Sequence, residues 1–539
     1  MTDPTALPRT EHPLPDSTRA EQPRAGRDGG PAPGDTRSPD DSDPPLTVDV
    51  RLLPAAVAAW AAALAVVRLP AGAAAACGAL VTVLVVVGLA CAARFRRGPA
   101  LLPVLGLALA AGAVVLCAGS AQVAARAEGL LPGLARDEAA GRIEGVVVVE
   151  PTLVAPAWPG APERARCVIA AERVTAGGRT SGAVGHVLVL GPASWTSVPY
   201  GARVVAAGRL RPGEPGSRTV AVLLAGGAPD VTRAAPPWDT TATAFRHGVR
   251  ALAAPLPGDA GALLAGVSVG DTGAVPDDLA AAMRTAGLTH VTAVSGAHFS
   301  LVAALVLALA AAARLSRAAR VALTVVAMAA MVLVVHPSPS VLRAAAMGLV
   351  GVLGVVLGRP HRAPAALSAT VVLLLVADPW LAGELGFVLS VLATGGLVLV
   401  GGPLAERWSS RCGRPVATAL ALPVAAQLMC APAILAVTPT VALYGVPANL
   451  LVAPALAPAT VLGLAAGCVA PWWGGGAHVL ALGAGAACWW IGAVARVVAA
   501  APGAQVAWLP GWVGVVALVV ASACVLRLVA VRGAAAERR

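Results

Sequence analysis

A string of polar residues interrupts an otherwise apolar stretch in the middle of this chain. Residues 287–301 read GLTHVTAVSGAHFSL, so two histidines and a Ser-Gly pair stand directly before an apolar segment that ends near Ala313. Polar and ionisable groups at the mouth of a membrane span are costly to bury and usually mark a pathway or a site. Helix capping and small-residue packing would account equally well for any single residue. The interpretation therefore depends on the complete string.

Two kinds of chemistry are conceivable for these residue types. Ser295 beside a histidine could act as a nucleophile, and His290 and His298 with Asp271 could hold a metal ion. Serine hydrolysis also needs an orienting acid and an oxyanion hole, and the context of a nucleophile elbow is missing. The two histidines are eight residues apart, unlike the i, i+4 pair of a helical zinc site. The nine cysteines form no CxxC motif. We predict no catalytic residue, no metal and no cofactor.

The composition is that of a polytopic membrane protein. The chain has 539 residues, is 57% hydrophobic and has a mean hydropathy of +0.77, and apolar runs of about 18 residues or more recur along it. Aromatic residues make up only 3%, so we expect small residues to pack the helices closely. Every basic residue is arginine and the net charge is +11. Arginine-rich cytoplasmic loops explain that charge better than a nucleic-acid partner does.

The amino-terminal part divides into a polar tail and three apolar segments. Residues 1–50 are rich in Pro, Asp, Gly and Ser and are predicted to be disordered; they lack the pattern of a signal peptide. Residues 51–124 are predicted to form transmembrane helices at 52–67, 69–93 and 99–124. Arginines at 94, 96 and 97 mark the cytoplasmic side after the second helix. The amino terminus is then inside, and residues 125–245 are outside.

The predicted outer region, residues 125–245, has the pattern of a small all-β domain. Five β-rich runs are separated by Gly, Pro and Ser clusters, at 142–150, 166–174, 186–191, 203–210 and 218–225. Five short strands at this spacing suggest a small barrel or sandwich, and an OB-like barrel is a natural candidate. Such a barrel binds single strands with a basic groove and stacking aromatics. Trp158, Trp195 and Tyr200 are available for stacking, although a mildly basic surface over core aromatics explains them too.

The remainder is predicted to be interfacial helices and a linker over 246–286, a membrane domain over 287–531 and a cytoplasmic tail over 532–539. An amphipathic helix is expected at 246–256 and a polar helix at 277–286. Nine apolar segments follow, at 287–313, 318–336, 341–358, 364–377, 385–402, 416–437, 441–470, 477–501 and 510–531. Arginine clusters fall in alternate loops, which predicts twelve spans with both termini inside. Segment 364–377 is short for a span, and 441–470 is broken by Pro447, Pro454 and Pro458.

Several motifs in this chain resemble those of the ComEC-type DNA-internalisation competence proteins. In that family a Gly-Leu-Thr-His run leads into Ala-Val-Ser-Gly-x-His, as it does at residues 287–298. LLAGVSVGDT at 263–272 resembles the family's Leu-x-x-Gly-Asp element. Further similar elements are PSVLRAAAM at 339–347, DPWLAGELGFVLSVLAT at 378–394 and YGVPANLLVAP at 444–454. The resemblance covers roughly residues 260–460, in good order and spacing.

The resemblance implies a function and a set of residues. The family's proposed role is passage of single-stranded DNA across the inner membrane, so the matching polar residues would line or shape that path. They are Gly270, Asp271, Thr289, His290, Ser295, Gly296, His298, Arg343, Ser390, Gln427 and Asn449. The Arg343 guanidinium needs a partner within a span, and a phosphate would serve; the alternative is snorkelling to the outer surface. We expect His290, Ser295, His298 and Arg343 to gather around a polar cavity beneath the outer domain.

The fold class expected is a mainly α polytopic membrane protein of about twelve helices with a small extracytoplasmic OB-like β domain. The implied partners are single-stranded DNA, membrane lipids, a DNA receptor, a separate nuclease, a cytoplasmic ATP-driven helicase and a second copy of the chain. Longer family members carry a carboxy-terminal metallo-β-lactamase-like domain. Only eight residues follow Val531 and no HxHxDH string occurs, so we expect a channel in the inner membrane rather than an enzyme. A secondary transporter for a small solute and a membrane-embedded hydrolase using His290 and His298 are the alternatives.

Overall fold

The computed structural model describes residues 51–94, 101–154, 158, 160, 162–292, 294–336, 341–348 and 363–536. Several predictions fall elsewhere: the disordered tail over 1–50, the arginines at 96 and 97, the start of the 339–347 motif and most of the 341–358 span lie outside the described residues. The arginine cluster at 359 and 362 also lies outside them. The structural statements below concern the described ranges.

Three helices precede a separate β-sheet region. They are α1 (Leu53–Val66), α2 (Ala71–Arg94) and α3 (Leu101–Ala127), followed by the short α4 (Leu131–Arg136). The strands are β1 (Ala140–Val154), β2 (Arg164–Ala176), β3 (Arg179–Pro192), β4 (Arg203–Pro212), β5 (Thr219–Ala225) and β6 (Asp230–Arg233). Their order is β1-β2-β3-β5-β4-β6, and β1 also pairs with β4, so five strands close on themselves. The β3–β5 pairing is parallel.

The alternation of the strands explains the core of the β region. Ile143, Ile169 and Leu223 are fully buried on the inner face, because successive side chains of a strand point to opposite sides. Trp195, on the 3₁₀ turn η1 (Ala193–Ser197), fills the same core beside Gly191, where a Cβ would overlap the indole ring. All five predicted strands are present. β6 was not predicted, because its four residues are exposed and carry no apolar alternation.

The rest of the described chain is helical apart from two three-residue strands. The helices are α5 (Pro237–Ala253), α6 (Asp259–Val269), α7 (Asp277–Thr285), α8 (Thr289–Thr292), α9 (Gly296–Ala312), α10 (Arg317–Val335), α12 (Ala363–Ala377), α13 (Leu385–Gly396), α14 (Gly402–Cys412), α15 (Arg414–Leu435), α16 (Gly445–Val469), α17 (Gly474–Ala500) and α18 (Gly511–Ala536). Residues 341–348 are also helical. A 3₁₀ turn η2 (Pro379–Gly383) precedes α13, a π-helical segment η3 (Leu397–Gly401) joins α13 to α14, and β7 (Thr440–Ala442) pairs with β8 (Gln505–Ala507).

Seven helices in the described ranges are long and apolar enough to cross a membrane. They begin at residues 71, 103, 317, 385, 414, 445 and 474, and five shorter apolar helices accompany them. The protein is therefore a mostly helical membrane protein with a separate β-sheet region. Three segments differ from the predicted spans. Segment 441–470, predicted to be broken by prolines, forms the continuous helix α16 with Pro454 and Pro458 inside it. The predicted span 287–313 is divided at Ser295 into α8 and α9, and the helix from Leu385 continues to Cys412 through its π-helical segment.

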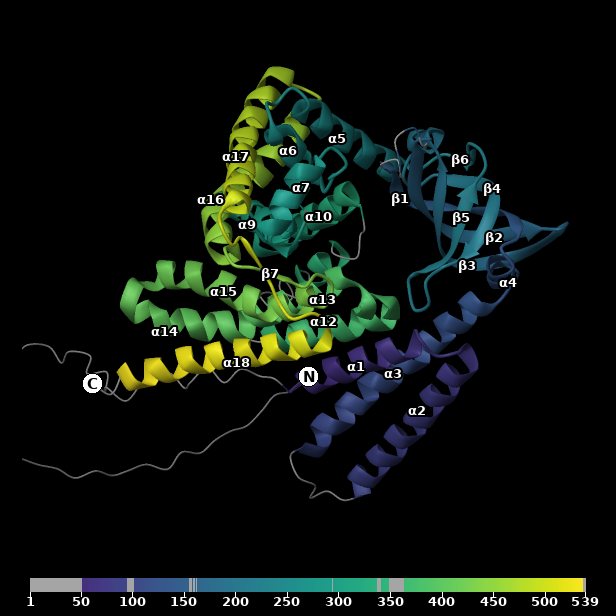
Figure 1. The fold of residues 1–539 in the computed structure, drawn as a ribbon, viewed down its shortest axis with the longest axis horizontal. Helices are drawn as coiled ribbons and strands as arrows, with labels where there is room; N and C mark the ends of the chain where they lie inside the picture. The colour runs from purple at the N-terminus through teal and green to yellow at the C-terminus, as the bar shows by residue number, and fades with distance from the viewer. Residues whose placement is uncertain are drawn as a thin grey trace, which may run out of the picture. The chain divides into compact units, whose positions relative to one another are not determined.

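Helix α6 is buried more deeply than a linker would be. Eight of its 11 residues are buried, and four of them join one core cluster with residues of α7, α16 and α17 (Figure 1). Small residues on the long helices make room for it: Gly463 of α16 lies beneath Leu264 and Ser268. The prediction described residues 246–286 as interfacial helices and a linker, and it gave no helix at 259–269. In the structure α6 is part of the helical core.

Candidate functional site

The break between α8 and α9 is held by Ser295 and His298. The Ser295 side chain accepts a hydrogen bond from the backbone N–H of His298, and His298 Nδ1 accepts one from the backbone N–H of Ser295 at 3.1 Å. This reciprocal cap satisfies two donors that a helix start leaves free. His298 is fully buried, and its Nε2 has no partner among the described residues. The pair therefore begins a helix, and the orienting acid of a catalytic triad is not in place on that nitrogen.

His290 lies one turn earlier, in α8, and contacts α16. Its ring is hydrogen-bonded to the Asn449 side chain and to the backbone of Gly287, and it interacts electrostatically with His298. His290 is exposed to solvent. Thr289 beside it is also exposed.

Gln427 lies in the same region, because the backbone at Gly287 closely approaches Gly445 and Gly445 lies beside Gln427. Gly287 has φ +72°, and a Cβ there would lie 3.5 Å from the Cα of Gly445. A Cβ on Gly445 would in turn lie 3.2 Å from Gln427 Oε1, and Gln427 Nε2 donates to the carbonyl oxygen of Ala442 at 3.5 Å. The α7–α8 turn, α15 and the start of α16 therefore converge. The structure brings His290, Ser295, His298, Gln427 and Asn449 into one neighbourhood, which we call the central polar cluster.

Asp271 belongs to a different group, beside the β region. Arg250 of α5 bridges Asp271 and Glu150, donating to Glu150 Oε1 at 2.8 Å, and Arg246 donates to Glu150 Oε2 at 2.9 Å. Burial by itself would raise the pKa of both carboxyl groups, but the two guanidinium groups outweigh it and lower the pKa of Glu150 and of Asp271. Asp271 therefore links the end of α6 to Glu150 of β1 through Arg250.

The preceding glycine explains the Gly-Asp element of the sequence. Gly270 ends α6 in the left-handed conformation, with φ +71°, and a Cβ there would meet Val335 at 3.0 Å. The turn that follows directs Asp271 to Arg250 of α5. Sequence reasoning missed Glu150, Arg246 and Arg250. The i, i+4 spacing of the two arginines was the only available signal, and it did not identify their partner.

Arg343 makes no described hydrogen bond, ion pair or ring contact with His290, Ser295 or His298. It is 3% exposed, and its guanidinium carbon lies 5.5 Å from the Phe387 ring centroid, with Glu384 close enough to interact electrostatically. Its Nε and Nη1 have no partner in the described part of the chain. Val341 and Ala344 on either side of it share a core cluster with Val294 and Phe299. The placement of Arg343 with the two histidines around a polar cavity stays a prediction.

The segment just before α13 receives the connection between β4 and β5. Arg218 donates to Asp378 at 2.8 Å and lies 3.9 Å from Glu384. Arg126, at the end of α3, donates to the Arg218 carbonyl at 3.3 Å and places its guanidinium carbon 3.2 Å from the Trp380 ring centroid. The Asp-Pro motif thus anchors the β region. Ser390, two turns into the motif's helix, is half-buried, and its carbonyl accepts a hydrogen bond from Thr394.

The described ranges contain no candidate metal site, because no three His, Cys, Asp or Glu residues lie close enough together to hold a metal ion. Gly296 occupies the first position of α9 and is exposed. Its small size leaves the backbone beside Ser295 open to close approach.

Comparison with known proteins agrees with the motif pattern. Residues 267–533 match the family model described as "Competence protein". A segment of 144 residues is 27% identical to "ComE operon protein 3" of Bacillus subtilis (strain 168). That segment is 27% of this chain and 19% of the relative, so the match spans about a fifth of the relative's length. No solved structure matches the chain.

Proposed function

Because the chain belongs to the competence protein family, of the ComEC type, we propose that it is an inner-membrane channel that carries single-stranded DNA into the cytoplasm during natural transformation. Membership of the family points to a role in DNA uptake. The more specific proposal concerns the path that the strand takes. It assigns the helical part to conduction and the β region to guiding the strand.

The observation that carries this proposal is the exposed His290 beside Asn449, close to the break between α8 and α9. A polyanion cannot pass through an apolar bundle, and polar groups at membrane depth persist only where protein or water satisfies them. His290, Asn449 and Gln427 supply hydrogen-bonding groups near this break, and irregular backbone at membrane depth either is buried in protein or lines hydrated space. Their donors and acceptors suit bases and phosphates without selecting a sequence.

The proposed guiding role requires an OB-like fold for the β region. Its closed order β1-β2-β3-β5-β4, the parallel β3–β5 pairing and the short η1 between β3 and β4 support that fold. OB folds bind oligonucleotides on the face of strands 2 and 3 and with the loops after strands 1 and 4. Trp158, after β1, is 64% exposed, and the loop after β4 is tied to η2 by Arg218. A strand on this face would therefore lie next to the helices.

We also propose the orientation of the chain. The arginines at 314, 317 and 320 flank the α9–α10 turn, and those at 411 and 414 flank the α14–α15 turn. By the positive-inside rule these turns are cytoplasmic. The β region is then outside, and both termini are inside. The proposed partners are a DNA receptor outside, a separate nuclease, an ATP-driven helicase in the cytoplasm and a second copy of the chain.

The test is transformation frequency in a deletion strain, scored together with entry of labelled DNA into the cytoplasm. Arg343→Ala should reduce DNA entry while leaving surface DNA binding and protein abundance unchanged. Arg343→Lys should restore entry in part, because it keeps the charge but loses the planar fork. Arg173→Ala is the matched control, because Arg173 is an exposed arginine of the β region. Normal entry in the deletion strain would reject the channel, and normal entry in Arg343→Ala would reject a pore role for that residue.

A further inference from the structure

The α16–α17 pair has the length and composition of two membrane-crossing helices. The helices contain 25 and 27 residues, which at 1.5 Å per residue is about 37 Å and 40 Å, more than the roughly 30 Å of a bilayer core. Length alone therefore predicts that the turn between them, at residues 470–473, lies on the opposite side of the membrane from their other ends. The contacts of the two ends do not agree with this.

The end of α16 nearest the turn lies beside the β region. Gly467 is covered by α5, because a Cβ there would meet Phe245 at 2.6 Å and Val249 at 2.8 Å. The next residue of α5, Arg246, pairs with Glu150 of β1 at 2.9 Å. A helix is about 10 Å across, so this end of α16 is within one helix diameter of a residue that touches the β region.

The other end of α16 lies on that side as well. Helix α15 packs antiparallel to α13, since Cys430 Sγ donates to the Leu389 carbonyl and Gly401 approaches Leu422. The last turn of α15 is therefore beside the first turn of α13. Glu384, immediately before α13, lies 3.9 Å from Arg218 of the β region. The short connection through β7 then leads into α16 from this side.

Both ends of α17 also lie on the side of the β region. It starts next to the end of α16, and the segment after it forms β8, which pairs with β7 in the register Thr440↔Ala507. We infer that the α16–α17 hairpin does not cross the membrane and instead lies along the face that carries the β region, with lipid against its open side. Figure 1 shows the two helices side by side, next to α6.

The exposed residues of the hairpin include four tryptophans. Trp472 and Trp473 stand in the turn and are 86% and 69% exposed, and Trp489 and Trp490 of α17 are 57% and 44% exposed. Tryptophan is enriched at the boundary between headgroups and acyl chains, where its ring is buried and its N–H stays polar. The buried residues of α17 are mostly Ala and Gly, together with Cys488, Ile491 and Val494, and they pack on α6 and α7.

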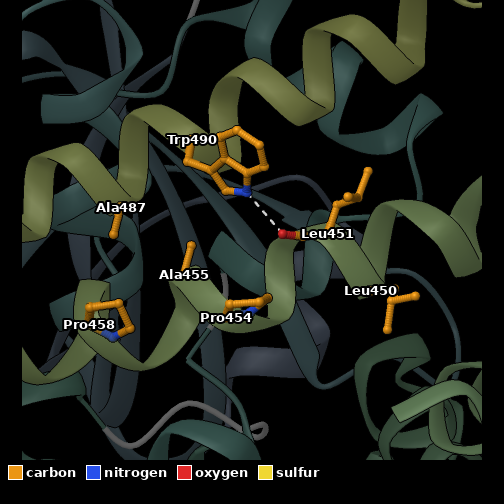
Figure 2. Close-up of a pocket in the computed structure, with 7 residues that line it drawn as sticks. All are labelled: Leu450, Leu451, Pro454, Ala455, Pro458, Ala487 and Trp490. Carbon is orange, nitrogen blue, oxygen red and sulfur yellow. Dashed lines mark hydrogen bonds between the residues drawn. The ribbon is translucent and has the colours of Figure 1, made fainter. Parts of the chain in front are cut away.

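A groove between the two helices offers a place for an acyl chain. It measures about 460 Å³ and is lined by Leu450, Leu451, Pro454, Ala455, Pro458, Ala487 and Trp490 (Figure 2). All seven side chains are apolar or aromatic. The indole N–H of Trp490 is already donated to the Leu451 carbonyl at 2.9 Å. The groove therefore presents no free side-chain donor, and a hydrocarbon chain is the occupant that its chemistry fits.

With the hairpin on one side of the membrane, the chain makes two fewer crossings than the twelve that the sequence predicts. The carboxy terminus stays on the side where the sequence places it. It also places α6, which packs against the hairpin, and the start of α16 with Asn449 on the face where DNA would arrive. The hairpin lies along the membrane on the same side as the β region. Its topology is independent of whether the protein conducts DNA.

Single cysteines test the inference in a variant whose nine native cysteines are replaced. Gly474→Cys is the reporter, because no atom lies within 4 Å of a Cβ at that position. Gly226→Cys marks the β-region side, and a restored Cys412 marks the far end of the 28-residue helix that starts at Leu385. A membrane-impermeant maleimide is applied to intact cells and then to permeabilised cells.

We expect Gly474→Cys to react in intact cells, as Gly226→Cys does, while Cys412 reacts only after permeabilisation. Reaction of Gly474→Cys together with Cys412 would overturn the inference. A thiol held in lipid reacts from neither side, so a protease-recognition sequence inserted between Trp473 and Gly474 provides a second measurement. Cleavage by protease added outside supports the hairpin, and cleavage only in inverted vesicles rejects it.

Discussion

Glu150 of β1 pairs with two arginines of α5, and its removal should destabilise the protein strongly. The carboxylate accepts hydrogen bonds from Arg246 at 2.9 Å and from Arg250 at 2.8 Å. The Arg246 side chain is 5% exposed and that of Glu150 is 21% exposed. In Glu150→Ala, Arg250 keeps Asp271, but Arg246 keeps only the backbone carbonyls of α6 and α10. A guanidinium that water hardly reaches then loses its hydrogen-bonded carboxylate, and Asp271 remains as a counter-charge without a hydrogen bond to it.

The expected loss is about 3–5 kcal/mol in the free energy of unfolding, which is the cost of stranding one member of a buried ion pair. Glu144→Ala is the matched control on the same strand. Glu144 pairs with Arg173 at 3.2 Å, but the Arg173 side chain is 60% exposed, so its removal should cost only about 0.2–1 kcal/mol. Adding Arg246→Met to Glu150→Ala removes the stranded charge and should recover part of the loss.

The measurement is equilibrium unfolding of the purified full-length protein in mixed micelles, followed by circular dichroism. Equal losses in Glu150→Ala and Glu144→Ala would refute the reasoning, because burial would then have no influence on the cost. A further loss on adding Arg246→Met would also refute it, since the arginine would be stabilising the fold without its carboxylate.

Two further predictions concern the β region and the helical core. Burial beside Arg218 lowers the pKa of His186 to about 4 from its ordinary value near 6.5, so the unfolded chain binds a proton that the folded chain does not, and stability should fall as the pH drops from about 6.5 to 4. His186→Gln should flatten that part of the profile of unfolding free energy against pH; an unchanged slope would contradict this. Gly463→Ala should cost about 1–3 kcal/mol, because the new Cβ would overlap Ser268. Gly248→Ala in α5, where nothing lies within 4 Å, should not destabilise, and similar losses in both would count against the close packing.

Most of the secondary structure follows from local patterns in the sequence. The five predicted strands and the apolar segments correspond to strands and helices because alternation and unbroken apolarity act over five to twenty neighbouring residues. The start of α9 was less clear, since the Ser-Gly pair and His298 suggested chemistry. The structure shows that Ser295 and His298 make a cap, whose reciprocal hydrogen bonds depend on a backbone geometry that residue types alone do not reveal.

The association of the site residues depended on contacts between distant parts of the chain. Asp271 was identified from the Gly-Asp element, but its partner Arg250 was not, and Arg250 also binds Glu150, 100 residues away in the chain. Arg343 was placed with His298 because both are near the predicted outer ends of spans, and its contacts with Phe387 and Glu384 were not expected. Neither result could come from spacing, because side-chain direction and helix rotation are settled by packing.

By itself, the sequence determined that this is a polytopic membrane protein with a β-sheet region and with the motifs of a competence protein, because hydropathy, alternation and motif order are properties of short segments. Only the tertiary structure decided which polar residues share a neighbourhood and on which side the ends of α16 lie. An apolar run of 25 residues satisfies the length of a bilayer whether it crosses or lies along it. The contacts at its two ends, with α5 and with the segment after α15, are what distinguish the two arrangements.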